Sequence, residues 1–230
     1  MIAVQPPTYF PGLPYLALME RVTVFILADT FQYSRQSFQN RAKVRTPQGW
    51  QWVTVPLKGR QHGRTIREVE VDNRKDWAAK HRRALQYNYR RAPFFEYYEA
   101  ALEEVFGTTW PTLGPLTCRT VILLHRLYGL DSTVRLASDL PGAPDTLTGI
   151  LAHFPDERLV VPVSTAVHDA HSVPGLSIFQ YNAESYHQNF DGFVERLSGL
   201  DLLFNYGFET RGRLRSGIQP LFRRENTNPT

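Results

Sequence analysis

The chain has 230 residues, of which 42% are hydrophobic and 21% are charged, and this balance excludes a largely disordered chain. Its 26 Lys and Arg residues against 22 Asp and Glu residues give a net charge of only +4, which makes a nucleic-acid-binding protein the less favoured class. We predict one α/β domain over residues 1–207 and a basic, partly disordered tail over residues 208–230.

The cysteine content does not indicate an oxidising compartment, and the hydropathy pattern does not indicate a membrane span. Cys118 is the sole cysteine, so the chain cannot form an internal disulfide, and we expect a buried thiol. No apolar stretch approaches the roughly 20 residues that cross a bilayer, and no basic segment followed by an apolar one opens the chain. We therefore predict a cytoplasmic protein without a membrane span.

Two short apolar runs near the start predict parallel strands that are buried on both faces. They cover residues 2–4 and 22–27, and a short helix over residues 13–21 is expected to connect them. Four prolines between residues 6 and 14 restrict the backbone of the intervening loop. We predict an open, mainly parallel, doubly wound (Rossmann-like) sheet with an inserted β-hairpin and a helical segment.

Polar residues follow each of these two predicted strands. Gln5 and Tyr9 come after the first strand, and Asp29, Gln32 and Arg35 come after the second. In open α/β sheets the carboxyl ends of neighbouring parallel strands border the ligand crevice. We therefore expect the two polar clusters to face one another and to form the functional site.

The middle of the chain changes from strand to helix patterns. Residues 42–46 and 50–57 predict a hairpin in which Trp50 and Trp52 share one face and serve in packing. The alternation over residues 66–71 predicts a strand with one exposed face. From about residue 74 a helix is expected to bury one face, and further helices are expected over residues 94–106 and 113–128. The buried face of the first helix comprises Trp77, His81, Leu85, Asn88 and Tyr89.

The last third of the chain predicts short elements. Strands are expected over residues 133–138, 159–163 and 176–180, with a short helix ending near Leu151, and further helices over residues 193–197 and 200–205. His168 and His171 flank Asp169, a spacing that can serve a metal ion, but no third ligand accompanies them. We predict no metal site, and the pattern indicates no particular cofactor.

The motifs taken together resemble the WbqC-like protein family, which is known mainly from bacterial surface-polysaccharide and O-antigen gene clusters. The resemblance spans about residues 2–207. It rests on Gln5-Pro6, Tyr9-Phe10-Pro11, Tyr15, Asp29, Gln32-Tyr33, Asn40-Arg41, residues 49–56, Trp77, Lys80-His81, Tyr89, residues 92–95, and residues 197–198 and 200–207. Two positions depart from the family pattern, since Pro14 replaces a usual glycine and Ala28 replaces a frequent second aspartate.

The resemblance implies a transferase that moves an acyl or aminoacyl (glycyl-type) group onto an amino-sugar during polysaccharide assembly. Such a reaction needs a base, and we predict Asp29 for this role, with His81 as the alternative. Hydrogen-bonding residues orient the substrate, and cations hold the phosphates of a nucleotide-sugar or another phosphorylated small molecule. The predicted substrate-binding residues are Gln5, Tyr9, Tyr15, Gln32, Arg35, Asn40, Arg41 and Lys80.

Two alternatives come from other functional classes. A nucleic-acid or polyanion-binding protein is consistent with the helix over residues 81–91, in which tyrosines and arginines interleave. A non-catalytic scaffold of a polysaccharide-assembly complex is the second alternative. The sequence does not indicate an oligomeric state.

Overall fold

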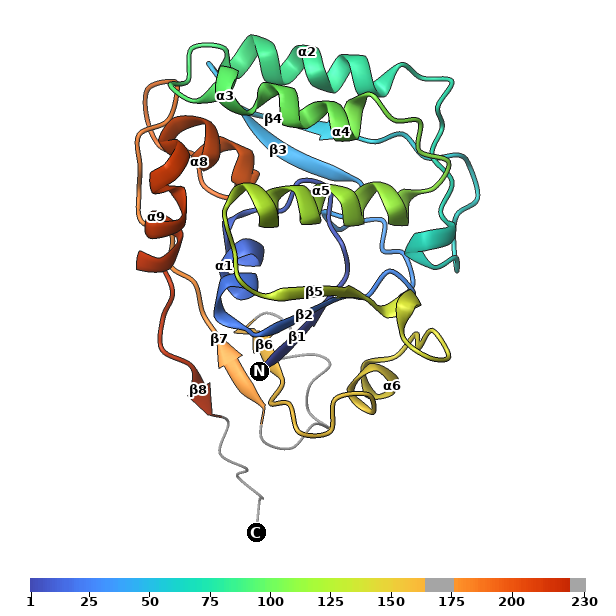
Figure 1. The fold of residues 1–230 in the computed structure, drawn as a ribbon. Helices are drawn as coiled ribbons and strands as arrows, with labels where there is room; N and C mark the ends of the chain where they lie inside the picture. Colours follow the sequence, from blue (N-terminus) through green and yellow to red (C-terminus); the bar gives the residue numbers. More distant parts are fainter. Residues whose placement is uncertain (164–175, 224–230) are drawn as a thin grey trace.

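The computed structural model describes residues 1–163 and 176–223, and Figure 1 shows their arrangement. His168 and His171 lie outside the described residues. The central sheet contains three parallel strands in the order β1-β2-β5. These strands are β1 (Ile2–Gln5), β2 (Val24–Leu27) and β5 (Thr133–Leu136). The two parallel strands predicted near the start are therefore confirmed.

A second sheet continues from the edge of the first. It contains β6 (Val160–Pro162), β7 (Ser177–Phe179) and β8 (Phe222–Arg223), with β6 and β7 parallel and β7 and β8 antiparallel. A bridge between Ile2 and Leu159 links it to β1. The protein is thus mixed α/β with a parallel sheet. The doubly wound, Rossmann-like arrangement is not confirmed, because the described strands form separate sheets of three, two and three strands.

Both faces of the central sheet are buried, as predicted from the continuous apolar runs. Ala3 and Phe25 point into the larger core, where α1 (Leu13–Arg21) and α5 (Leu113–Leu127) cover the sheet. Val4 and Ile26 point into a smaller core on the side of α6 (Leu147–Leu151). Figure 1 shows these helices on opposite sides of the sheet. Cys118 of α5 is buried, as expected.

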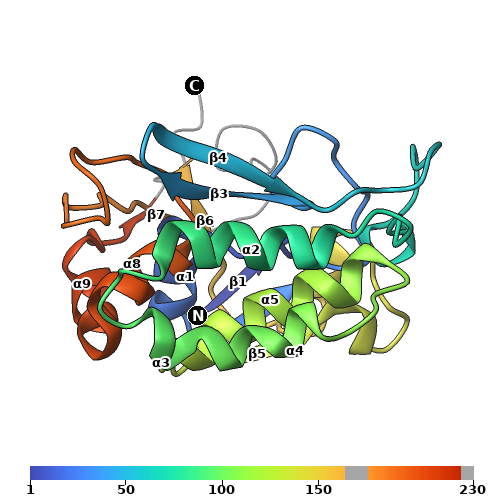
Figure 2. The ribbon, with the colours of Figure 1, turned by 90° about the horizontal axis from the view of Figure 1, so that it is seen from above.

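A β-hairpin and several helices form a layer beyond α5. The hairpin pairs β3 (Arg41–Thr46) with β4 (Gly49–Thr54) and lies alongside α2 (Trp77–Tyr89), as Figure 2 shows. The buried residues of α2 are the five predicted from its periodicity. The predicted helix over residues 94–106 is interrupted. It comprises α3 (Phe95–Glu99), a 3-10 turn (Ala100–Leu102) and α4 (Glu103–Phe106).

The predicted strand over residues 66–71 is wrong. A 3-10 turn spans Ile66–Glu68, and the carboxylate of Glu68 accepts hydrogen bonds from the backbone N (3.1 Å) and the hydroxyl (2.8 Å) of Thr65. This capping box offers the backbone a local partner in place of a neighbouring strand. The Thr-x-x-Glu spacing was visible in the sequence.

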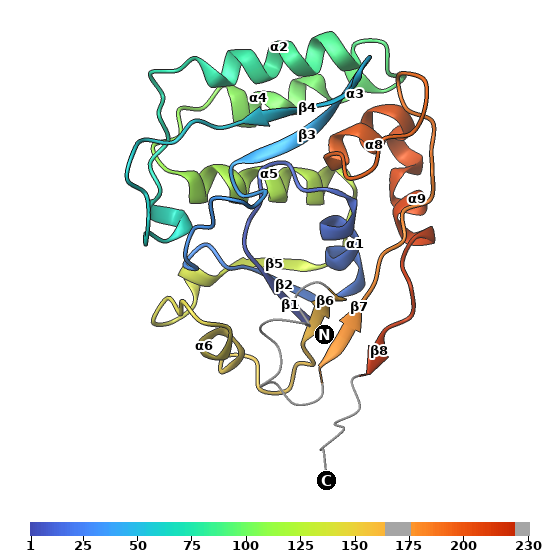
Figure 3. The same cartoon turned by 180° about the vertical axis from the view of Figure 1, so that it is seen from behind.

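The C-terminal part of the described chain packs on the domain. Helix α8 (Gly199–Tyr206) confirms the helix predicted over residues 200–205, whereas no helix covers residues 193–197. Helix α9 (Thr210–Ser216) follows the 3-10 turn Gly207–Glu209 and pairs its Arg211 with Glu20 of α1 at 3.2 Å. Figure 3 shows α8 and α9 at one end of the hairpin. The domain boundary near residue 207 stays a prediction.

The remaining described helical element is the 3-10 turn Ala137–Asp139, which follows β5. Among the described residues, no helix has the length and apolar character needed to traverse a bilayer.

Candidate functional site

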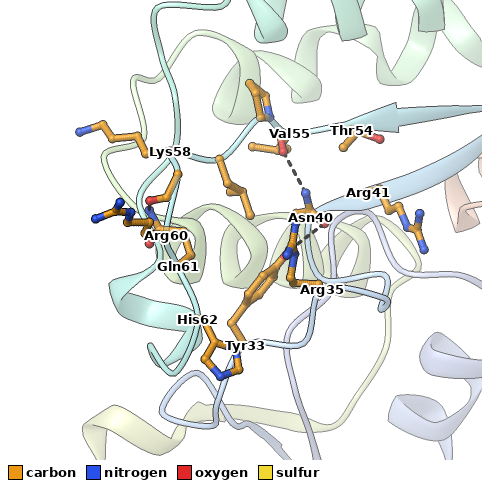
Figure 4. Close-up of a pocket in the computed structure, with 13 residues that line it drawn as sticks. Tyr33, Arg35, Asn40, Arg41, Thr54, Val55, Lys58, Arg60, Gln61 and His62 are labelled. Carbon is orange, nitrogen blue, oxygen red and sulfur yellow. Dashed lines mark hydrogen bonds between the residues drawn. The ribbon is translucent and has the colours of Figure 1, made fainter.

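A basic cavity of about 480 Å³ lies where the first strand of the hairpin begins and the second ends. One wall is the loop that leads from β2 to β3, and the other wall is the segment after β4. Figure 4 shows the two walls and the side chains between them. The lining residues are Tyr33, Arg35, Asn40, Arg41, Thr54, Val55, Pro56, Leu57, Lys58, Gly59, Arg60, Gln61 and His62.

The charge of this cavity is of one sign. Its lining includes four cations, Arg35, Arg41, Lys58 and Arg60, and contains no aspartate or glutamate. Lys58 pairs with Glu70 at 3.4 Å, outside the lining. The three arginines form no ion pair within the described part of the chain. Cations gathered in a concave site without carboxylates raise the local concentration of anions, so the cavity suits an anionic ligand.

The wall between β2 and β3 is held by hydrogen bonds through Asn40. Its side chain accepts a bond from the Tyr33 hydroxyl at 3.2 Å and donates one to the Val55 carbonyl at 3.0 Å. Figure 4 shows Asn40 between these two partners. Burial raises the pKa of Tyr33, while Arg35 and Arg41 act in the opposite direction. Tyr33 is therefore a neutral hydrogen-bond donor at physiological pH.

The wall formed by the segment after β4 contains an arginine with a strained backbone, and hydrogen bonds to neighbouring segments hold this wall. Arg60 has a φ of +57°, a left-handed conformation that costs a residue with a side chain about 1–2 kcal/mol. Gln61 is buried and accepts a hydrogen bond from the Glu70 backbone N at 3.2 Å. The Arg64 carbonyl accepts a bond from the Tyr33 backbone N at 2.9 Å, which ties the two walls together. Hydrogen bonds of neighbouring residues thus fix the backbone near the exposed Arg60.

The cavity gathers some of the predicted site residues. Arg35, Asn40 and Arg41, three of the predicted substrate-binding residues, line it together. The prediction missed six further polar residues of the lining, which are Tyr33, Thr54, Lys58, Arg60, Gln61 and His62. The sequence signal for the last four was the segment over residues 58–64, where cations, an amide, an imidazole and two glycines follow a predicted hairpin strand.

Tyr9 and His81 form a buried pair away from the cavity lining. The Tyr9 hydroxyl lies 2.9 Å from Nδ1 of His81, and the side chains of both residues are buried beside Trp77. Burial lowers the pKa of His81 to about 4, and a hydrogen bond with the Thr54 backbone partly opposes this shift. His81 is therefore neutral at physiological pH. Its partner Thr54 lines the cavity, so the pair lies directly behind the site.

Asp29 is also buried, and its carboxylate contacts the 3-10 turn that follows β5. Its Oδ1 accepts a hydrogen bond from the Ser138 backbone N at 3.0 Å, and its side chain does not line the cavity. The catalytic assignments to Asp29 and His81 stay predictions.

The other predicted substrate-binding residues lie apart from the cavity lining. Gln5 ends β1 and is half-buried, and the Tyr15 hydroxyl donates to the Pro6 carbonyl at 3.2 Å. Gln32 is exposed in the loop after β2, and Lys80 is exposed on α2. None of these four residues lines the cavity.

The two loops expected to face one another do come into contact. The Tyr9 backbone N donates to the Phe38 carbonyl at 3.0 Å, and the Ala28 backbone N donates to the Gln5 carbonyl at 2.9 Å. These contacts are between backbones. Within residues 1–163 and 176–223, no group of three or more His, Cys, Asp or Glu side chains is arranged to hold a metal ion.

The fold and the cavity define a mixed α/β protein with a site suited to an anionic ligand. The chain belongs to the WbqC-like protein family, whose model matches residues 5–212, and the predicted resemblance is confirmed. It is 33% identical over 227 residues to the uncharacterized protein Rv1507c of Mycobacterium tuberculosis, an alignment that covers 93% of this chain and 97% of that protein. No solved structure matches the chain.

Proposed function

We propose that the chain is a cytoplasmic transferase that binds a phosphorylated substrate in the basic cavity. It moves an acyl or aminoacyl group, of the glycyl type, onto an amino-sugar for bacterial surface polysaccharide such as O-antigen. The observation that carries this proposal is the single-sign charge of the cavity, in which arginine forks are available to bind phosphate bidentately. Membership of the family supports it.

The proposed step joins the amine of the sugar to the acyl group of an activated donor. The amine attacks the acyl carbon, the new C–N bond forms, and the bond to the thiolate or phosphate leaving group breaks. A base takes the proton that the amine loses. His62 places an exposed imidazole in the cavity, whereas Asp29 and His81 are buried and hydrogen-bonded elsewhere. We therefore propose His62 as a third candidate for the base.

Ligand-binding measurements test whether the chain binds a phosphorylated substrate in the basic cavity. A nucleotide-sugar or an acyl-CoA should raise the melting temperature, and the corresponding neutral sugar should not. Arg35→Ala and Arg60→Ala should each weaken binding about tenfold, because each removes a charge-assisted hydrogen bond. Arg67→Ala is the matched control, since Arg67 is exposed near the same wall but does not line the cavity. If no phosphorylated ligand shifts the melting temperature, the proposal is wrong.

Turnover measurements test whether the chain transfers an acyl or aminoacyl group onto an amino-sugar. The purified protein is incubated with a nucleotide-linked amino-sugar and an acyl-CoA, and mass spectrometry detects transfer of the acyl mass. His62→Gln, Asp29→Asn and His81→Gln are compared at equal folded fraction. The variant that loses turnover while it still binds substrate identifies the base. Binding without transfer for any donor would favour the scaffold alternative.

A further inference from the structure

Three aromatic side chains cluster next to the cavity, of which Phe38 and Trp50 are exposed and Trp52 is half-buried. Trp50 and Trp52 lie on one face of β4 with ring centroids 5.4 Å apart, and Phe38 lies 5.5 Å from Trp52. Trp50 is 44% exposed and Phe38 is 45% exposed. The packing role predicted for the two tryptophans is therefore not one in the core. We call Phe38, Trp50 and Trp52 the aromatic platform. Large apolar side chains that cluster in solvent mark a binding surface.

Two cations lie over this platform. The Arg41 guanidinium is 4.3 Å from the Trp52 ring centre, and the Lys43 ammonium is 3.9 Å from that of Trp50. Within the described residues neither cation has a carboxylate partner. A surface that combines exposed rings with free cations matches a ligand that is both flat and anionic.

The aromatic platform is continuous with the basic cavity. Arg41 pairs with Thr54 across the hairpin, and both residues line the cavity, while Arg41 also contacts the Trp52 ring. Trp52 and Thr54 lie on the same face of β4, two residues or about 7 Å apart. A molecule with a planar ring one short spacer away from its phosphates can therefore occupy both surfaces at once.

We propose that the aromatic platform stacks the base of a nucleoside diphosphate whose phosphates occupy the basic cavity. This inference rests on the proposed function and deepens it, because nucleotide-sugars and coenzyme A thioesters share this chemical group. Arg41 is the link between the two surfaces, able to contact a phosphate from its position over the Trp52 ring. A neutral saccharide would satisfy the rings but leave the cations without a partner.

Affinity measurements by titration calorimetry separate base stacking from phosphate binding. The ligands are inorganic pyrophosphate, uridine, uridine diphosphate, coenzyme A and an oligouridylate. Stacking of one base on an aromatic ring is worth about tenfold in affinity. Uridine diphosphate or coenzyme A should therefore bind about ten times more tightly than pyrophosphate. Which of the two binds more tightly distinguishes a nucleotide-sugar site from a coenzyme A site.

The variant Trp52→Ala should bind uridine diphosphate and coenzyme A no more tightly than pyrophosphate. Its affinity for pyrophosphate should stay within about twofold of the wild type. Trp110→Phe is the matched control, because Trp110 lies away from the platform and donates to the Val105 carbonyl. The double variant Trp50→Phe/Trp52→Phe provides a spectroscopic test. It should lose the change in intrinsic fluorescence that the nucleotide causes in the wild type.

Each other outcome has a distinct meaning. Equal affinities for pyrophosphate and the nucleotides in the wild type would overturn the stacking inference and leave the proposed function standing. Failure of every phosphate ligand to bind would overturn both. Tighter binding of the oligouridylate than of either nucleotide, lost in Trp52→Ala, would replace the nucleotide site with a single-stranded nucleic-acid surface.

Discussion

Arg41 and Arg45 lie on the same face of β3, four residues apart, and the protein uses them in opposite ways. Arg41 lines the basic cavity and lies over the Trp52 ring. Arg45 is 1% exposed and donates hydrogen bonds to five backbone carbonyls, those of Thr46, Gly49, Phe190, Asp191 and Gly192. One arginine is available to a ligand, and the other joins the hairpin to a distant loop.

The difference shows how burial decides the role of a polar residue. Around Arg45, the Tyr89 hydroxyl accepts from the Arg45 backbone N at 2.8 Å and donates to Asp201 at 3.0 Å. Tyr186 donates to the same carboxylate at 2.7 Å. These buried polar groups mostly satisfy one another and fix the fold, although Nε of Arg45 has no hydrogen-bond partner among the described residues. Of the cavity's cations, Lys58 pairs with Glu70, whereas Arg35, Arg41 and Arg60 have no carboxylate partner within the described residues. These three arginines can therefore bind a ligand.

The largest expected effect comes from removing the buried arginine. Arg45→Met leaves buried carbonyls without donors, and each such group costs roughly 1–3 kcal/mol. We expect a loss of about 3 kcal/mol or more in the free energy of unfolding, measured by urea denaturation. Arg41→Met is the matched control on the same strand face, with a change within about 0.5 kcal/mol. Equal losses for both variants would contradict the assignment of separate roles.

His81 should make the protein less stable in acid. Its pKa in the folded state is about 4, below the ordinary value of 6.5, so its stabilising contribution is present above pH 6.5 and is lost as the pH falls through 4. One pKa unit corresponds to about 1.4 kcal/mol. The stability of the wild type relative to His81→Gln should therefore fall by about 3 kcal/mol between pH 7 and pH 4. A constant difference would show that burial does not control this imidazole.

Asp201 should have the opposite pH dependence. Burial raises its pKa to about 6 from 3.8, against the effects of its Tyr186 and Tyr89 hydrogen bonds. Its contribution is therefore present below pH 3.8 and is lost as the pH rises through 6. The stability of the wild type relative to Asp201→Asn should fall by about 3 kcal/mol between pH 4 and pH 7. Urea unfolding across this range checks the sign, and a rise would contradict the burial argument.

A substitution in α5 with a smaller expected effect tests whether the core supports the cavity wall formed by the segment after β4. A Cβ at Gly114 of α5 would lie 2.5 Å from Cα of Arg67, in the turn behind that wall. Gly114→Ala should cost about 1–3 kcal/mol through overpacking and should also weaken ligand binding. Gly212→Ala is the control in α9, where nothing lies within 4 Å, and it should stabilise the protein by about 0.5–1 kcal/mol. If Gly114→Ala binds the ligand as tightly as the wild type, packing at Gly114 does not support the cavity wall.

Local periodicity made several elements predictable. The buried face of α2 followed from the spacing of its apolar residues, and the first two strands followed from runs of apolar residues. The strand predicted over residues 66–71 was wrong because a side-chain cap at Thr65 and Glu68 competes with the alternation pattern. The predicted site was found in part, since Arg35, Asn40 and Arg41 line the cavity.

The sequence by itself determined which faces of the elements are apolar, the hairpin, and the family to which the chain belongs. The tertiary structure decided where the cavity lies, because the hydrogen bond from the Tyr33 backbone N to the Arg64 carbonyl joins its two walls beyond the hairpin, and no local pattern predicts that contact. The tertiary structure also decided which arginine of β3 is accessible to a ligand. Alternation places Arg41 and Arg45 on the same face, but only the contact with residues 190–192 buries one and leaves the other beside the cavity.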